Sequence, residues 1–438
     1  MIRIYDWLNQ EALDLHYSLQ AAGIMGETIV LNDEGNLPED ITSPYRYFCN
    51  ATSDTGKALY FNQLTVPEGW QITGNNTEGE VWSYGVKKAT IHYHMPLYLR
   101  LIKQVDWLTL DGKVYVTDHY NQYGWCFAKT YFDGNQQVVL KKYFTKQGHE
   151  VISHNLVTGD VLLSWQGKDY HFTRLVDFIL FYLAEAGYNL SNIWYNSLGL
   201  PFLASYYYQG EGVDTLFWQE DVGEAIPGNM KLILEGNAGR TKRVVVQQKT
   251  VYEKLLRLAS AEEAEKIAYL GYIYPNIRTN HNRKQALILT NSDQIEGLDN
   301  LLRNLQDYHI HIAALTEMSQ HLIDYESFQQ VTLYPNVSQK MVDQLFEACD
   351  VYLDINHGGE ILSASRRAYE SNLLILGFDN TVHQRQFMSA DHIFKAQEPE
   401  QMADFLRQCQ DLPRAVAKQR SEAGQSTPAD YHQILGGY

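Results

Sequence analysis

The chain has few cysteines and little positive charge for its length. Its 438 residues include four cysteines and no Cys-x-x-Cys pair; the cysteines are Cys49, Cys126, Cys349 and Cys409. This wide spacing argues against a zinc site or a disulfide framework and predicts a reducing, cytoplasmic compartment. Lys and Arg number 35 against 52 Asp and Glu, a formal net charge of −17. Because nucleic-acid binding depends largely on basic side chains that neutralise phosphates, this balance argues against a nucleic-acid partner.

Long apolar runs and familiar catalytic motifs are also missing. No run approaches the 18 apolar residues of a membrane-spanning helix, so we expect a soluble protein whose membrane contact, if any, is peripheral. The sequence contains no G-x-S-x-G, H-E-x-x-H or P-loop motif. The pairs His92/His94 and His309/His311 each place two histidines on one strand face, but neither pair has an evident third ligand. We therefore expect no metal and no cofactor.

Two kinds of sequence pattern divide the chain. Apolar strand-like and helix-like runs alternate in residues 1–44, 171–280 and 281–412, with strands expected at, among others, residues 230–234 and a hinge at 278–284. Residues 45–170 instead carry β-rich runs separated by turn signals roughly every ten residues, as in an antiparallel meander. We predict an α/β protein of two Rossmann-like domains, with the meander inserted into the first. Residues 413–438 are expected to pack back on the first domain.

The region 349–383 has the pattern strand, glycine-bearing loop, helix, strand. Its loop follows an apolar strand at residues 351–355, which places Asn356, His357 and Glu360 at the carboxyl edge of a sheet, where α/β proteins bind ligands. An alternative interpretation is an ordinary connection, in which Gly358 and Gly359 permit the turn and Glu360 favours the helix N-terminus.

The sequence lacks the groups that a sugar nucleotide requires. The loop after residues 286–290 begins at Asn291 and contains Asp293 and Glu296, with no Lys or Arg before Arg303. Such a loop would repel a diphosphate by several kcal/mol in a partly buried cleft. No glycine follows the first strand, where residues 8–11 read Leu-Asn-Gln-Glu. Both features argue against a binding site for a sugar-nucleotide donor.

Polar and aromatic residues gather at the predicted strand ends of the first α/β half. Asn196 and Ser197 precede a run of tyrosines that includes Tyr206, and Trp218 ends another predicted strand. Such residues suit a groove for an extended Ser/Thr-rich polypeptide or its sugars, although aromatic side chains also dominate protein cores. Both interpretations remain open at this point.

Several strings resemble a known family across essentially the whole chain. They include Met-Ile-Arg-Ile-Tyr-Asp-Trp-Leu at residues 1–8, Trp-Tyr-Asn-Ser-Leu-Gly at 194–199, Thr-Asn-Ser-Asp-Gln-Ile-Glu-Gly at 290–297 and Leu-Asp-Ile-Asn-His-Gly at 353–358. These strings are similar to those of the glycosyltransferase-stabilising proteins of the bacterial accessory Sec system. Those proteins are non-catalytic B subunits of a two-protein transferase that adds N-acetylglucosamine to Ser/Thr of serine-rich repeat adhesins.

The resemblance implies a GT-B fold like that of the retaining family 4 glycosyltransferases. It also implies that the meander contacts a catalytic A subunit carrying UDP-N-acetylglucosamine, while this chain binds the acceptor and stabilises its partner. The Glu-x7-Glu motif of family 4 falls on Gly359 and Arg367, so the second acid is replaced by a cation. We expect no catalytic residue; the candidate acceptor-binding residues are Asn196, Ser197, Tyr206, Trp218, Asn291, Asn356, His357 and Glu360.

Two other functions remain as alternatives. One is an active retaining glycosyltransferase with an unusual nucleotide site, acting on protein or on protein-bound N-acetylglucosamine. The other is a carbohydrate-binding scaffold with no role in transfer. Donor binding and an effect on a partner's activity distinguish these alternatives from the stabilising subunit.

Overall fold

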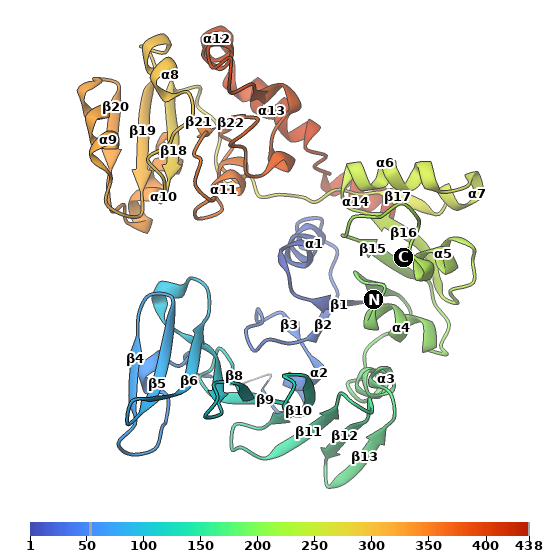
Figure 1. Cartoon of the computed structure of the whole chain (residues 1–438). Helices are drawn as coiled ribbons and strands as arrows, with labels where there is room; N and C mark the ends of the chain where they lie inside the picture. The colour runs from blue at the N-terminus through green and yellow to red at the C-terminus, as the bar shows by residue number, and fades with distance from the viewer. Residues whose placement is uncertain (52–54, 437–438) are drawn as a thin grey trace. The chain divides into compact units, whose positions relative to one another are not determined.

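A computed structural model describes residues 1–51 and 55–436 (Figure 1). By contacts the chain forms two compact units, Met1–Leu270 with Gln433–Tyr438, and Gly271–His432, here called unit 1 and unit 2. Each unit is described by itself. Over the described ranges, no helix combines the length and apolar character needed to cross a bilayer.

Unit 1 is built on a seven-stranded parallel sheet. Its strand order is β17 (Ile267–Tyr269), β16 (Thr241–Val246), β15 (Asp214–Trp218), β14 (Ile193–Tyr195), β1 (Ile2–Trp7), β2 (Glu27–Asn32) and β3 (Ile41–Thr42). The strands are short apolar runs because a parallel sheet is covered on both faces. The helices of this part are α1 (Gln10–Ala21), α3 (Leu175–Glu185), α4 (Leu200–Tyr207), α5 (Gly228–Leu234), α6 (Lys249–Leu258) and α7 (Ala261–Ala264). The strand order reverses between β1 and β14, which is where such sheets bind ligands.

The strand expected at residues 230–234 is wrong, because these residues belong to helix α5. Met230, Ile233 and Leu234 are its buried residues. Their spacing of three and four marks one helical face, and a short apolar run cannot distinguish this pattern from a buried strand.

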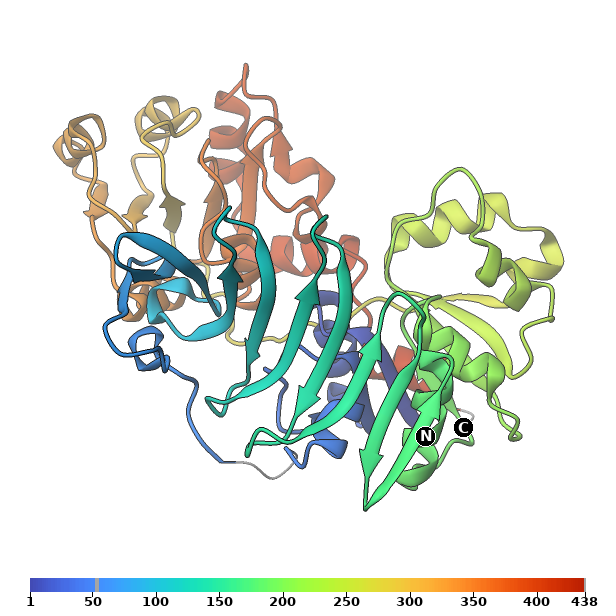
Figure 2. The same ribbon diagram turned by 60° about the horizontal axis from the view of Figure 1, so that its bottom comes forward.

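The β-rich block forms a ten-stranded antiparallel meander, as predicted. Consecutive strands pair from β4 to β13, and Figure 2 shows them as a row of ribbons from blue to green. The strands are β4 (Gln71–Gly74), β5 (Glu78–Ser83), β6 (Val86–Tyr93), β7 (Ile102–Leu108), β8 (Val114–Tyr120), β9 (Cys126–Phe132), β10 (Val138–Phe144), β11 (Glu150–Asn155), β12 (Val161–Trp165) and β13 (Lys168–Phe172). Alternating burial along β5 gives this strand one covered and one more open face.

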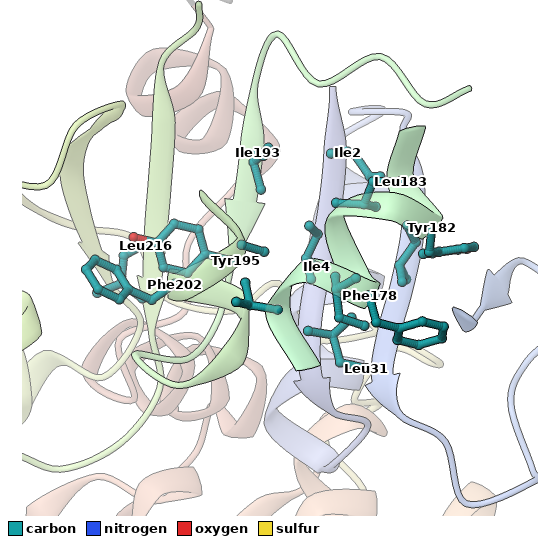
Figure 3. Packing of buried hydrophobic residues seen from close by; sticks show 14 of the residues in the cluster. Ile2, Ile4, Leu31, Phe178, Tyr182, Leu183, Ile193, Tyr195, Phe202 and Leu216 are labelled. Atoms are coloured by element: carbon teal, nitrogen blue, oxygen red, sulfur yellow. The ribbon is translucent and has the colours of Figure 1, made fainter. Parts of the chain in front are cut away.

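The later strands of the meander share a core with the parallel sheet. Tyr45 on α2 (Pro44–Phe48) stacks on Tyr143 of β10 with ring centroids 3.9 Å apart. Phe48 packs against Phe178 of α3 at 5.6 Å and against Trp165 of β12 at 5.2 Å. Figure 3 shows Phe178 and other α3 side chains beside residues of β1 and β2 in the same buried cluster. Helices α2 and α3 therefore join the two sheets through one core.

Unit 2 contains a six-stranded parallel sheet with helices on both faces. Its order is β20 (Val331–Tyr334), β19 (His309–Ala314), β18 (Gln285–Thr290), β21 (Val351–Asp354), β22 (Leu374–Phe378) and β23 (Ile393–Phe394). Its helices are α8 (Leu298–Asn304), α9 (Gln320–Ile323), α10 (Gln339–Ala348), α11 (Ala364–Glu370), α12 (Glu400–Gln408), α13 (Leu412–Glu422) and most of α14 (Pro428–Leu435). Alternate strand residues enter two buried clusters, one on each face. This sheet reverses its order between β18 and β21.

Residues 278–284, expected as a hinge, are bound to unit 2. Arg278 and Arg283 both pair with the buried carboxylate of Asp350, and Asn280 donates to the Asp350 carbonyl at 3.0 Å. Burial alone would raise the pKa of Asp350, but its hydrogen bond from Arg283 and the charge of Arg278 hold that pKa below its usual value. The segment is thus anchored at the start of β21.

The C-terminal segment divides between the two units. Gln419 of α13 accepts the Ile375 backbone N–H of β22 at 2.9 Å and is fully buried. Arg243 of β16, in contrast, donates to the Ile434 carbonyl within unit 1. The sequence had placed the whole of residues 413–438 on the first domain, but helix α13 packs on unit 2.

Candidate functional site

The loop after β21 is fixed by its own side chains. Asn356, which is 3% exposed, accepts from the Thr290 hydroxyl at 2.8 Å and from the Gly358 N–H at 3.0 Å. Its amide nitrogen donates to Oδ1 of Asn291 at 3.2 Å. Asn356 therefore joins the loops that follow β18 and β21, and its hydrogen-bonding groups are occupied within the protein.

His383 holds the same loop from the end of β22. It bonds to Asp354 through Nδ1 and to the Gly358 carbonyl through Nε2, at 2.6 and 2.7 Å. The Asp354 hydrogen bond raises the pKa of His383 to about 9, against an opposing effect of burial. At neutral pH the ring is thus a cation that donates from both nitrogens.

Glu360 caps helix α11. One carboxylate oxygen accepts from the Ser365 N–H at 2.9 Å and the other accepts from Gln384. The two residues before the helix, Leu362 and Ser363, have φ values of 53° and 50°. Left-handed conformations at two adjacent non-glycine residues are costly and persist only where the surroundings fix them. The contacts thus match the alternative in which Glu360 serves the helix N-terminus.

His357 and Asn291 are the exposed members of this group. Nε2 of His357 lies 2.7 Å from Oε2 of Glu296, and Asn380 donates to the same oxygen at 2.8 Å. Neither of the loops at residues 291–297 and 355–363 contains a Lys or an Arg. The carboxyl edge of unit 2 is therefore polar and carries acidic groups, but its loops after β18 and β21 offer no Lys or Arg to a diphosphate.

The guanidinium of Arg367 contacts helix α10. Its guanidinium donates to Asp343 at 2.7 Å and lies 4.4 Å from the ring centroid of Phe346. A cation held in this way cannot accept hydrogen bonds from ribose hydroxyls, as a carboxylate at its position would. Gly359, at the other acidic position of the motif, has no side chain.

The carboxyl edge of the unit 1 sheet carries a continuous chain of polar side chains. Asn32 donates to Oδ1 of Asp6 at 2.6 Å, and the Ser197 hydroxyl donates to Oδ2 of Asp6 at 3.0 Å. Asn196 accepts the Asp6 N–H at 2.9 Å and donates to Gln219 at 2.9 Å. Gln219 then donates to Gln247 at 2.8 Å. We call Asp6, Asn32, Asn196, Ser197, Gln219 and Gln247 the polar ladder.

The ladder spans five neighbouring strands, from β2 through β1, β14 and β15 to β16. Asn196 and Ser197 were predicted, whereas the other four were not. A usable signal was present, because each follows or ends an apolar run, as Gln247 follows Val-Val-Val. Its buried members are oriented by their neighbours, while Asp6, Asn32 and Ser197 are partly exposed and can bind hydroxyl or amide groups.

Tyr206 and Trp218 do not join the ladder. Tyr206 lies in the last turn of helix α4, not at a strand end as expected, and stacks on Phe202 at 5.6 Å. Because α4 runs back along the sheet, its last turn lies toward the opposite edge. Trp218 is 4% exposed and belongs to the core cluster, which favours a packing role.

The two histidine pairs have other partners. His92 pairs with Asp106 at 2.8 Å, His309 with Thr332 at 2.8 Å, and His311 with Gln285 at 2.7 Å. Within the part of the chain that the structure describes, no group of three or more His, Cys, Asp or Glu side chains is placed to hold a metal ion.

Comparison with known proteins identifies the family. Family profiles match four successive stretches, described as the GtfB N-terminal domain at residues 2–48, the GtfB middle domain at 70–173, the GtfB third domain at 175–258 and the GftB/GlyA-F C-terminal domain at 286–422. A UDP-N-acetylglucosamine–peptide N-acetylglucosaminyltransferase stabilizing protein GtfB from Streptococcus parasanguinis is 54% identical over 435 residues, 99% of each chain. The chain belongs to the GtfB family.

A GtfB protein of Streptococcus agalactiae is 47% identical over 439 residues, 100% of this chain and 99% of the relative. A solved structure described as the GtfA/B complex bound to UDP and GlcNAc contains a chain with a TM-score of 0.93 and 43% identity, covering 100% of this chain and 99% of that one. TarM, at a TM-score of 0.51 and 14% identity, supports the GT-B fold alone. The predicted family and fold are confirmed, and these GtfB relatives are named as stabilising proteins of the transferase.

Proposed function

We propose that this chain is the non-catalytic, acceptor-binding and stabilising subunit of a two-protein peptide O-GlcNAc transferase. The carboxyl edge of unit 2 carries this proposal. Transfer from UDP-N-acetylglucosamine requires cations that neutralise the departing diphosphate. The loops after β18 and β21 supply Asp293 and Glu296 and no Lys or Arg, and Arg367 is engaged by Asp343.

Exposed polar side chains in both units suit the binding of an acceptor polypeptide. The partly exposed ladder residues Asp6, Asn32 and Ser197 offer hydrogen bonds to the hydroxyls and main chain of a Ser/Thr-rich polypeptide. In unit 2 the exposed Asn291 and His357 offer similar contacts. We take this acceptor to be a serine-rich repeat adhesin that is glycosylated at the cytoplasmic face before export by the accessory Sec system.

The meander supplies a surface for the catalytic subunit. Successive turns of an antiparallel meander alternate between its two ends, so the β5–β6, β7–β8 and β11–β12 turns share one end. Their tips carry Tyr84, Leu110 and Val157, which are 97%, 88% and 73% exposed. We call these three residues the apolar tips. Burying such exposed apolar side chains against a partner would be favourable, and a similar chain is part of the GtfA/B complex.

Equilibrium binding to the isolated chain tests whether it binds the acceptor and not the sugar donor. Calorimetry should detect binding of a Ser/Thr-rich adhesin peptide. UDP-N-acetylglucosamine at millimolar concentration should give no saturable heat. The acceptor peptide with its Ser and Thr replaced by Ala is the matched control. Saturable donor binding, with slow hydrolysis or transfer, would favour the active glycosyltransferase instead.

A further inference from the structure

Three neighbouring strands of the unit 1 sheet are each followed directly by a buried amide side chain. Asn196 follows β14, Gln219 follows β15 and Gln247 follows β16. Their exposed fractions are 7%, 6% and 3%. A buried amide is unfavourable unless it is hydrogen-bonded, and a bonded network holds its members in one arrangement. We call these three residues the amide row; it is the buried part of the polar ladder.

The hydrogen bonds of the amide row run in one direction. The Asp6 N–H donates to Oδ1 of Asn196 at 2.9 Å, so Nδ2 of Asn196 donates to Oε1 of Gln219, also at 2.9 Å. Nε2 of Gln219 then donates to Oε1 of Gln247 and to the Glu11 carbonyl, both at 2.8 Å. A backbone N–H can only donate and a backbone carbonyl can only accept. The main chain at Asp6 and Glu11 therefore fixes which way Asn196 and Gln219 face.

Asn196 connects the amide row to the partly exposed residues of the ladder. It holds the main chain of Asp6, and the next residue, Ser197, donates its hydroxyl to Oδ2 of Asp6 at 3.0 Å. Turning the Asn196 amide over would place its NH₂ group against the Asp6 N–H and its oxygen against Oε1 of Gln219. The bond to Gln219 thus keeps Asn196 in the orientation that holds Asp6.

Packing alone does not require three amides in these positions. Apolar side chains of similar shape would fill the same space, and replacing both partners of a buried hydrogen bond in this way can be nearly neutral for stability. Side chains that bind a ligand, in contrast, must be held in one geometry by bonded neighbours. The row also lies at the carboxyl edge of the sheet, where parallel sheets bind ligands.

Resting on the proposed function, we propose that Gln219 is a positioning residue for acceptor binding. Through Asn196 it holds Asp6 and Ser197 in the geometry that meets the acceptor polypeptide, and Gln247 supports Gln219 in turn. The amide row therefore sets the affinity for the acceptor from within the sheet. Its loss weakens acceptor binding and leaves the chemistry of the catalytic subunit unchanged.

Two substitutions of similar size at Gln219 separate positioning from stability. Gln219→Met removes the oxygen that accepts from Asn196. Gln219→Glu keeps an oxygen facing Asn196 but places a carboxyl group against the Glu11 carbonyl and Oε1 of Gln247. The control is Gln419→Met in unit 2, where a fully buried glutamine bonds only to the main chain of β22 and the residue before it. All three variants should unfold at a lower temperature than wild type.

Binding of a bare Ser/Thr-rich adhesin peptide to the full chain is measured by calorimetry, and KM and kcat for the peptide are measured in the complex with the catalytic subunit. Gln219→Met should weaken binding about fivefold, the equivalent of one hydrogen bond, and raise KM with kcat unchanged. Gln219→Glu and Gln419→Met should bind the peptide as wild type does. Gln247→Met, which leaves Gln219 bonded to Glu11, should weaken binding about threefold.

Peptide binding by wild type distinguishes the two levels of the account. If wild type binds and Gln219→Met binds equally well, the positioning role alone is refuted. An equal loss of affinity in Gln219→Met and Gln419→Met would also overturn it, because that loss would follow stability. If Gln219→Met does not fold, unchanged affinity in Gln247→Met refutes the positioning role. If wild type itself does not bind the peptide, the proposed function fails.

Discussion

His383 and Asp354 form a double contact at the carboxyl edge of the unit 2 sheet. The ring Nδ1 lies 2.6 Å from one carboxylate oxygen, and the His383 backbone N–H donates to the other at 2.8 Å. The far ring nitrogen reaches the Gly358 carbonyl, so one imidazolium connects the ends of β21 and β22 to the loop between β21 and α11. In this chain a cation at that edge is therefore used to hold the protein's own loop.

This contact predicts a pH dependence of loop stability. The pKa of His383 is raised to about 9, above its usual 6.5, so its stabilisation is complete below pH 6.5 and is lost as the pH rises through 9. The loss should be about 1–2 kcal/mol after allowance for solvent screening. Hydrogen exchange of residues 355–363, with rates corrected for intrinsic pH dependence, measures it. His383→Asn should remove the dependence, whereas His357→Asn should retain it; the same dependence in His383→Asn would contradict the assignment.

The adjacent glycines Gly358 and Gly359 differ in the space that a side chain would meet. A Cβ at Gly358 would lie 1.8 Å from Oδ1 of Asn291, whereas a Cβ at Gly359 would lie 4.0 Å from the nearest Asn291 atom. Gly358→Ala should destabilise unit 2 by about 1 kcal/mol, because the Asn291 side chain must turn away and release its hydrogen bond from Asn356, while Gly359→Ala should change stability by less than about 0.5 kcal/mol. Urea unfolding of the two variants measures the difference, and equal midpoints would show that the Asn291 side chain turns away without cost.

Arg367→Glu restores an acid at the second motif position without restoring donor binding. The loops after β18 and β21 still offer no Lys or Arg to a diphosphate, so calorimetry should show no saturable binding of UDP at millimolar concentration. Losing the Asp343 pair and the Phe346 contact should lower stability by about 1 kcal/mol. Arg366→Glu, which changes the neighbouring charge in the same helix, is the control for added negative charge. Saturable UDP binding by the Arg367 variant alone would show that a single side chain had closed the site.

The apolar tips are expected to contribute to partner affinity. Replacing Tyr84, Leu110 and Val157 together by Ser should weaken association with the catalytic subunit at least about tenfold, because buried apolar contact is lost. Thermal unfolding should be nearly unchanged, since the side chains are exposed. Met25→Ser, at another residue that is 78% exposed, should leave association intact. Undiminished co-purification of the triple variant would place the interface elsewhere.

The order of strands and helices followed largely from the sequence. The buried strands are apolar runs, and the meander has alternating residues between turn signals. Helix α5 was missed because its apolar residues are too few to show a period. The extent of the insertion was not predictable either, because Tyr45 and Phe48 contact Tyr143 and Phe178 across both parts of unit 1. Removing residues 45–170 would therefore expose the core face of α3.

The candidate site was partly predictable. The carboxyl edges, the acidic loops and Arg367 could be inferred from residue order. The hydrogen bonds of the polar ladder could not, because Asp6, Ser197 and Gln247 are far apart in sequence and come together only when their strands pair in the sheet. For Asn356 and Glu360, the sequence could not show that neighbouring groups already occupy their polar atoms.

Mixing the chain with its catalytic subunit tests the central claim most directly. N-Acetylglucosamine transfer to a serine-rich adhesin peptide is measured for each protein alone and for the two together, with UDP-N-acetylglucosamine as donor. The account predicts no transfer by this chain alone, weak transfer by the partner alone, and a rise of at least about tenfold for the mixture. Transfer by this chain alone, or an unchanged rate on mixing, would contradict it.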